Sequence, residues 1–181
     1  MKHIVLYIII GITLLSCSER QEYVDRLEQA KSLLDEHPDS ALQILDSLSL
    51  HEQDFSKSFR MKYQLLKLQA QNKTDAKMDT ISIVPEVADY YNSHGSHHDK
   101  MMANYMMGRY YADKGDAPRA LQYYREAVSY SDTTKTDCDY KNLSRIYGQI
   151  ATLFNMQRSP RLELDAEKKA VFYARKANDT I

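Results

Sequence analysis

The sequence predicts an all-α fold built from helical hairpins, and three observations support this prediction. Apolar residues recur at helical spacing along most of the chain beyond its first apolar segment. Glycine and proline are scarce, at 5 and 4 of 181 residues, and tyrosine is plentiful at 14, a composition that suits helical packing better than a sandwich or barrel. Short polar or proline-containing breaks divide the helical stretches into pairs, as expected for successive hairpins.

The N-terminal segment has the pattern of an export signal. Lys2 and His3 precede the apolar run Ile4–Leu15, which is too short to span a bilayer core of about 30 Å. The run closes with LLSC, which resembles the lipobox of bacterial lipoproteins. This resemblance implies that residues 1–17 are a lipoprotein signal peptide, that Cys17 is lipidated, and that the chain is held outside the cytoplasm in a bacterial cell envelope. An ordinary signal peptide or an uncleaved anchor is the alternative.

Two pairs of helices are expected in the first half of the remaining chain. A first hairpin, at about 20–50, breaks at His37-Pro38, because Pro38 can begin a second helix where its missing amide is harmless. A degenerate pair follows at about 54–95. Its second helix is expected from about residue 79 to His94, and Pro85 must then lie in the first turns or cause a kink.

The most informative stretch is the hairpin at about 100–131. Small and large residues alternate there at positions where two helices would cross: Gly108, Tyr111, Ala120, Tyr124 and Ala127. Gly115 can adopt a left-handed conformation after the first helix, and Asp116 can cap the second. This spacing resembles a tetratricopeptide repeat (TPR), a helical hairpin of about 34 residues. The resemblance implies a TPR-like α-solenoid of about three hairpins, with the pair at 54–95 as its least regular member.

The last hairpin is expected at about 140–178. Ala151 and Phe154 fit the repeat, whereas Glu163 and Glu167 stand where it has small or aromatic residues. Either this hairpin packs differently or the two carboxylates lie on a solvated face. Its second helix also carries a surplus apolar stripe of Leu164, Val171 and Phe172. A terminal repeat normally has a polar outer face, so we expect further repeats or another chain to cover the stripe.

The segment DEHPDSALQILDSL, residues 35–48, resembles the first hairpin of a group of TPR lipoproteins and sensor-like proteins from gut anaerobes. In TPR proteins the first helix of each repeat lines a concave groove. The resemblance assigns seven protein-binding positions to this groove: Met102, Tyr105, Arg109, Asp113, Arg145, Gln149 and Thr152. The Lys and Asn positions of carboxylate-clamp repeats are not matched, so an amphipathic helix or extended peptide is the expected ligand.

Other chemistry finds little support in the sequence. The 24 basic and 25 acidic residues, with a net charge of −1, argue against a nucleic-acid surface. His94, His97 and His98 could bind a metal ion, but their spacing matches no zinc motif, and a solvated turn is the favoured interpretation. Cys138 lies between two aspartates, which disfavour a reactive thiolate. No nucleophile elbow or phosphate loop is present.

Together these observations predict a non-enzymatic, membrane-tethered, extracytoplasmic TPR scaffold that binds a protein or peptide and needs no cofactor. Two alternatives stay open: the N-terminal sensor region of a longer signalling or transcription-regulating protein, and a metal-binding lipoprotein that uses the three histidines. Self-association or stacking with further repeats is possible at the C-terminal end.

Overall fold

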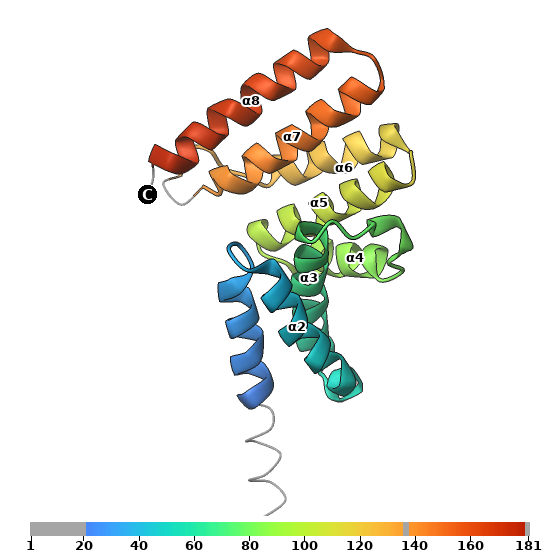
Figure 1. The fold of residues 1–181 in the computed structure, drawn as a ribbon, viewed down its shortest axis with the longest axis vertical. Coiled ribbons are helices and arrows are strands. Elements are labelled where there is room, and N and C mark those ends of the chain that lie inside the picture. Colours follow the sequence, from blue (N-terminus) through green and yellow to red (C-terminus); the bar gives the residue numbers. More distant parts are fainter. Residues whose placement is uncertain (1–20, 136–137, 180–181) are drawn as a thin grey trace, which may run out of the picture. The chain divides into compact units, whose positions relative to one another are not determined.

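The computed structural model describes residues 21–135 and 138–179, and within these ranges the chain is all helical with no strand (Figure 1). The prediction of an all-α fold is therefore confirmed. After a helix over residues 21–33 the elements are α2 (Pro38–Leu48), η1 (Ser49–Asp54), α3 (Lys57–Lys73), η2 (Met78–Thr80), α4 (Val84–His94), α5 (His97–Asp113), α6 (Ala117–Ser129), α7 (Tyr140–Met156) and α8 (Pro160–Asp179). The predicted signal peptide and Cys17 lie outside the described residues.

The chain divides into two compact units, the first ending at Asp75 and the second beginning at Ala76. This boundary falls between α3 and α4, inside the pair of helices expected at 54–95. In the described part of the chain, no helix combines the length and the apolar character needed to cross a bilayer.

The first unit buries one apolar core between the helix over residues 21–33, α2 and α3. The core consists of Leu27, Ala30, Leu34, Ala41, Leu45, Leu48, Phe55, Tyr63, Leu66 and Ala70. Within it, the Phe55 ring lies 4.8 Å from that of Phe59 and 5.6 Å from that of Tyr63. Pro38 occupies the first turn of α2, as the sequence predicts. Burial of these side chains supplies the main stabilising free energy of the unit.

The second unit is a succession of helices in which α4 packs on α5, α5 on α6, α6 on α7 and α7 on α8. The helix expected from about residue 79 begins instead at Val84, which places Pro85 in its first turn. This later start removes the need for a kink, because a first-turn residue has no intrahelical amide bond to lose. Ser96 and Asp99 form a capping box that fixes the start of α5.

The hairpins α5–α6 and α7–α8 are built in the same register. If Gly108 is matched to Ala151, the first and last residues of α5 correspond to those of α7, and the first residue of α6 corresponds to that of α8. The turns match as well, because Gly115 and Arg158 have positive φ angles of 75° and 53°. In both turns the backbone amide of the following residue donates to the carbonyl oxygen five residues before it. These bonds are Asp116 N to Tyr111 O and Ser159 N to Phe154 O, each at 2.9 Å. The second unit therefore contains an internal structural repeat.

Gly108 lies where α5 crosses α6. A Cβ atom added to Gly108 would overlap two ring carbons of Tyr124, a side chain that is fully buried. Ala120 and Ala127, on the same face of α6, are also fully buried. The sequence prediction that small and large residues interdigitate at this crossing agrees with these contacts, and Tyr111 is half-buried and stacks on Tyr123.

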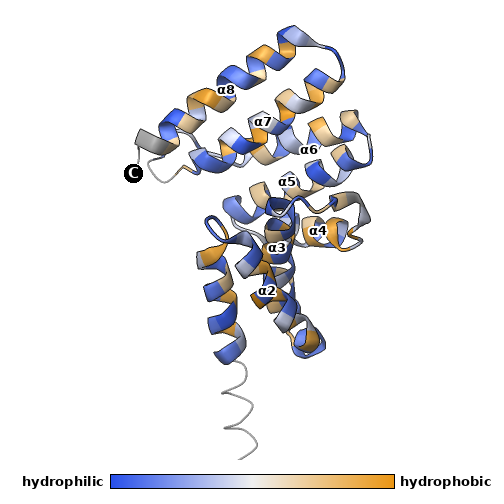
Figure 2. Ribbon diagram, viewed as in Figure 1, coloured by the Kyte–Doolittle hydropathy of each residue, from blue (hydrophilic) through white to orange (hydrophobic). Residues whose placement is uncertain are grey.

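The apolar stripe predicted on the last helix lies at the surface. Leu164, Val171 and Phe172 have 49%, 50% and 54% of their surface exposed. Figure 2 shows apolar and hydrophilic residues interspersed along α8, in agreement with a helix that has more than one apolar face. Glu163 is half-buried and accepts a hydrogen bond of 2.7 Å from Asn155, whereas Glu167 is exposed. Of the two alternatives, the exposed position of Glu167 fits a solvated face.

Candidate binding surfaces

Three of the predicted groove residues form one polar network that joins α5 to α7. Arg109 donates from Nη1 to Gln149 Oε1 at 2.7 Å, and its Nη2 lies 3.5 Å from Asp113 Oδ1. Asp113 also accepts the backbone amide of Met78 at 2.8 Å. The network connects the first helices of the two matched hairpins, so it links residues that are far apart in the sequence.

Two further predicted groove residues lie on α7, one turn to either side of Gln149. Arg145 is half-buried and donates from Nη1 to Asn142 Oδ1 at 3.1 Å, while Thr152 is exposed and donates to Gly148 O at 3.1 Å. Together with the network they give α7 a polar face from Arg145 to Thr152. Such a face can orient a peptide through its backbone and charged groups.

Met102 and Tyr105 do not belong to an open surface. Only 4% and 5% of their surface is exposed, and the Tyr105 ring lies 6.0 Å from the Tyr124 ring. Every residue of α5 from Met101 to Gly108 is buried. The resemblance to TPR proteins assigned both residues to the groove, but the stretch of α5 that carries them is buried on every side. These two residues therefore contribute to packing in this structure, and the accessible part of the predicted groove begins at Arg109.

The three histidines point to different partners. His94 contacts Tyr90, His97 contacts Tyr130 and His98 contacts Asp139. His94 Nδ1 lies 3.0 Å from a carbonyl oxygen, and His98 Nδ1 lies 3.3 Å from a carboxylate oxygen. Across residues 21–135 and 138–179, no three His, Cys, Asp or Glu side chains are grouped to hold a metal ion. In this structure His94 contacts a backbone carbonyl near the end of α4, His97 contacts a tyrosine ring and His98 contacts a carboxylate.

Asp139 joins the start of α5 to the start of α7. Its carboxylate caps α7 by accepting the Asn142 amide at 3.0 Å, and it pairs with His98. Burial acts to raise the pKa of Asp139, but the hydrogen bonds from His98 and Asn142 outweigh it, so the pKa lies below its ordinary value. The neighbouring Cys138 is a half-buried thiol in the connector.

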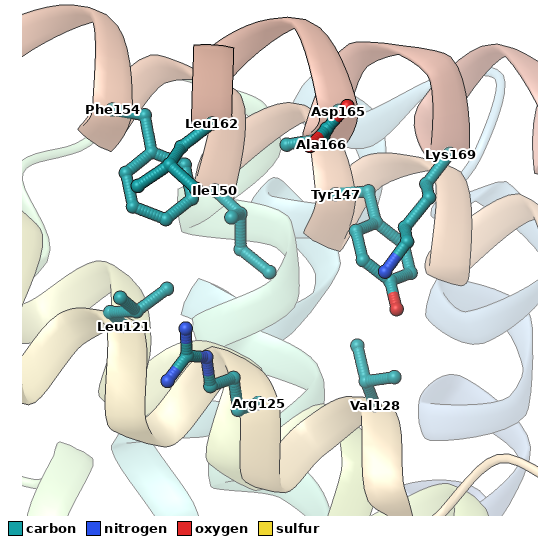
Figure 3. Close-up of a pocket in the computed structure, with 10 residues that line it drawn as sticks. All are labelled: Leu121, Arg125, Val128, Tyr147, Ile150, Phe154, Leu162, Asp165, Ala166 and Lys169. Carbon is teal, nitrogen blue, oxygen red and sulfur yellow. The ribbon is translucent and has the colours of Figure 1, made fainter. Parts of the chain in front are cut away.

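A pocket that the sequence analysis missed lies between α6, α7 and α8 (Figure 3). Its volume is about 290 Å³, and its lining comprises Leu121, Arg125, Val128, Tyr147, Ile150, Phe154, Leu162, Asp165, Ala166 and Lys169. At one end Leu121, Phe154 and Leu162 gather, and at the other Lys169 lies over the Tyr147 ring, 5.2 Å from its centroid. None of the seven predicted groove residues lines this pocket.

The matched hairpins explain why the pocket is open. In the first hairpin the Tyr111 ring stacks on Tyr123 at 5.4 Å, and Arg119 lies 4.4 Å from the Tyr111 centroid. The corresponding trio in the second hairpin is Phe154, Ala166 and Leu162. An aromatic ring is thus replaced by a methyl group, and the space beside Phe154 is left unfilled. The alanine in place of a tyrosine was the sequence signal that could have revealed the pocket.

Comparison of the chain with protein-family models, with curated proteins and with solved structures finds no match. Its function is therefore inferred from its own residues, from the internal repeat and from the two surfaces described above.

Proposed function

We propose that this protein is a membrane-tethered, extracytoplasmic scaffold of TPR-like helical repeats that binds a protein or peptide and catalyses no reaction. The observation that carries the proposal is the hydrogen bond between Arg109 on α5 and Gln149 on α7. It joins the first helices of successive hairpins, which is where a TPR-like solenoid has its ligand groove. The internal repeat supports the same architecture.

Arg145 and Thr152 supply the part of this face that a partner can reach. An arginine guanidinium offers several donors in a fixed geometry, which suits carboxylate and backbone oxygens of a peptide. The pair Arg109–Asp113 is held within the protein, so it fixes the shape of the face.

A photo-reactive side chain at Thr152 tests the proposal in cells. We expect crosslinking to a protein partner, and we expect Arg145→Glu to abolish it by reversing the charge one turn away. The same photo-reactive group at Glu28, which is exposed on the helix over residues 21–33, is the matched control. Equal crosslinking from both positions, or none from Thr152, would contradict a binding face on α7.

Membrane tethering is tested separately by Cys17→Ser. Loss of the lipid attachment should move the protein from the membrane fraction to the soluble fraction, because each buried methylene of an acyl chain contributes about 0.8 kcal/mol to anchoring. Retention of the processed variant in membranes would show that another anchor operates.

The exposed stripe on α8 favours a second candidate, in which this region is the sensor part of a larger signalling assembly. Leu164 and Val171 correspond in register to Leu121 and Val128, which face α7 and α8 across the pocket. A further helical repeat, in the same chain or in another, would cover the stripe in the same way.

A further inference from the structure

We propose that the pocket between α6, α7 and α8 binds an aromatic side chain of a partner peptide, placed next to an acidic residue of that peptide. The inference goes beyond the proposed function, because it uses none of the residues of the face on α5 and α7. It names a second site and the chemistry of its ligand.

The shape of the pocket selects an aromatic ring. Phe154 and Ala166 stand where Tyr111 and Tyr123 stack in the preceding hairpin, with an interplanar angle of 7°. The missing ring can therefore be supplied by a ligand that stacks on Phe154 and is bordered by Leu121 and Leu162. A volume of about 290 Å³ lies at the lower limit of small-molecule pockets, about 300 Å³, and so suits one large side chain.

The charges of the pocket select an acidic neighbour. Arg125 reaches from α6 into the space between α6 and α8 (Figure 3). It makes no hydrogen bond, ion pair or ring contact with any residue that the structure describes. Lys169 adds a second cation at the end formed with Tyr147. A carboxylate beside the bound ring would meet both cations, and charge-assisted hydrogen bonds to arginine are the stronger ones.

Asp165 favours a peptide over an anionic lipid as the occupant. Its carboxylate lies at the α8 side of the pocket, where it would repel a fatty-acid headgroup but could accept a backbone amide. Apolar walls, two cations and one anion together match the mixed groups of a peptide chain.

The test is a selection of random linear dodecapeptides against the full chain, followed by measurement of dissociation constants for the enriched peptides. We expect enrichment of Phe, Tyr or Trp within a few positions of Asp or Glu. Leu162→Trp should fill the pocket and weaken binding at least tenfold, while Leu164→Trp is the matched control and should leave it unchanged. These two leucines are on the same helix with 48% and 49% of their surface exposed.

Two more variants make the test specific. Arg125→Glu should change the selected peptides from acidic to basic without affecting folding. Arg145→Glu should leave the selected peptides and their dissociation constants unchanged, which separates this site from the face on α7. Ala166→Tyr should restore the ring of the preceding hairpin, raise the thermal midpoint and abolish binding. Failure to enrich aromatic and acidic peptides, or equal binding to Leu162→Trp and the wild type, would overturn the proposal. So would binding of laurate with no peptide enriched, since that would assign the pocket to a lipid.

Discussion

Gly108 shows how a single residue sets the distance between two helices. Its Cβ position is occupied by the Tyr124 ring, whereas a Cβ on Gly148, within α7, would meet nothing within 4 Å. Both glycines lie inside helices, so both gain about 1 kcal/mol of helix propensity on replacement by alanine. Only at Gly108 would the added methyl group overlap a buried ring.

We therefore predict opposite effects for the two alanine substitutions. Gly108→Ala should lower the free energy of unfolding by about 1 to 3 kcal/mol, the usual cost of overpacking, and Gly148→Ala should raise it by up to about 1 kcal/mol. Urea denaturation of the two variants measures this difference. Equal changes in both would contradict the close crossing of α5 and α6.

Asp139 gives a prediction for the dependence of stability on pH. Its pKa is lowered in the folded protein, so its contribution is present above the unfolded value of about 3.9 and is lost as the pH falls through the folded pKa. Asp139→Ala should lower the free energy of unfolding by about 0.5 to 2 kcal/mol at pH 7, as for other helix caps. The difference from wild type should shrink below about pH 4.

Denaturation curves between pH 7 and pH 3 check this prediction. Glu167→Ala, which removes an exposed carboxylate on α8, is the control and should change stability by less than about 0.5 kcal/mol at any pH. A constant penalty for Asp139→Ala across the range would show that the cap does not depend on the charge.

At the level of residues, the sequence predicted which side chains pack against each other better than it predicted which side chains are exposed. Gly108 and Tyr124 could be assigned from their spacing, because a close helix crossing needs a small residue opposite a large one. Met102 and Tyr105 could not, because their burial depends on what surrounds α5 and not on the pattern of α5 itself.

The turns of the matched hairpins are the clearest feature at the level of elements. Gly115 and Arg158 occupy the same turn position with positive φ. Glycine adopts this conformation freely, whereas a side chain makes it unfavourable by roughly 1 to 2 kcal/mol. The two turns have the same backbone hydrogen bonds, so the effect of the residue at this position can be compared between them.

Exchanging the residues should therefore change stability in opposite directions. Arg158→Gly should raise the thermal midpoint by a few degrees, since 1 kcal/mol corresponds to about 2 to 4 °C in a chain of this size. Gly115→Arg should lower it by a similar amount. Calorimetric scans of the two variants give the answer, and a lower midpoint for Arg158→Gly would refute the shared turn geometry.

Helix boundaries were predictable wherever proline or a capping residue fixed them. Pro38 and the Gly115-Asp116 turn are in the expected places. The start of α4 was placed too early, at about residue 79, where the chain forms the short helix η2 instead, and α4 begins only at Val84. The pocket beside Phe154 was missed because it depends on a side chain that is small, and a pattern of large apolar residues does not reveal an empty space.

At the level of the whole molecule, the exposed apolar residues of α8 bear on self-association. Leu164, Val171 and Phe172 form an apolar stripe that remains exposed among the described residues. Contiguous apolar patches on a protein surface usually mark an interaction site. We predict that the purified chain self-associates through this stripe as its concentration rises.

Sedimentation velocity over a range of concentrations tests this prediction. Val171→Glu combined with Phe172→Glu should reduce the weight-average sedimentation coefficient at high concentration to that of the monomer. Glu28→Lys, which changes an exposed charge on the helix over residues 21–33, is the control. A wild-type chain that stays monomeric at all concentrations would show that the stripe is not a self-association site.

Binding along α5 and α7 is tested most directly by hydrogen exchange of the full chain with and without the partner captured at Thr152. We predict slower amide exchange in residues 109–113 and 145–152 when the partner is bound, with little change in α2 and α3. Protection that is absent from α7, or confined to the helices of the first unit, would contradict a scaffold whose ligand lies across these two helices.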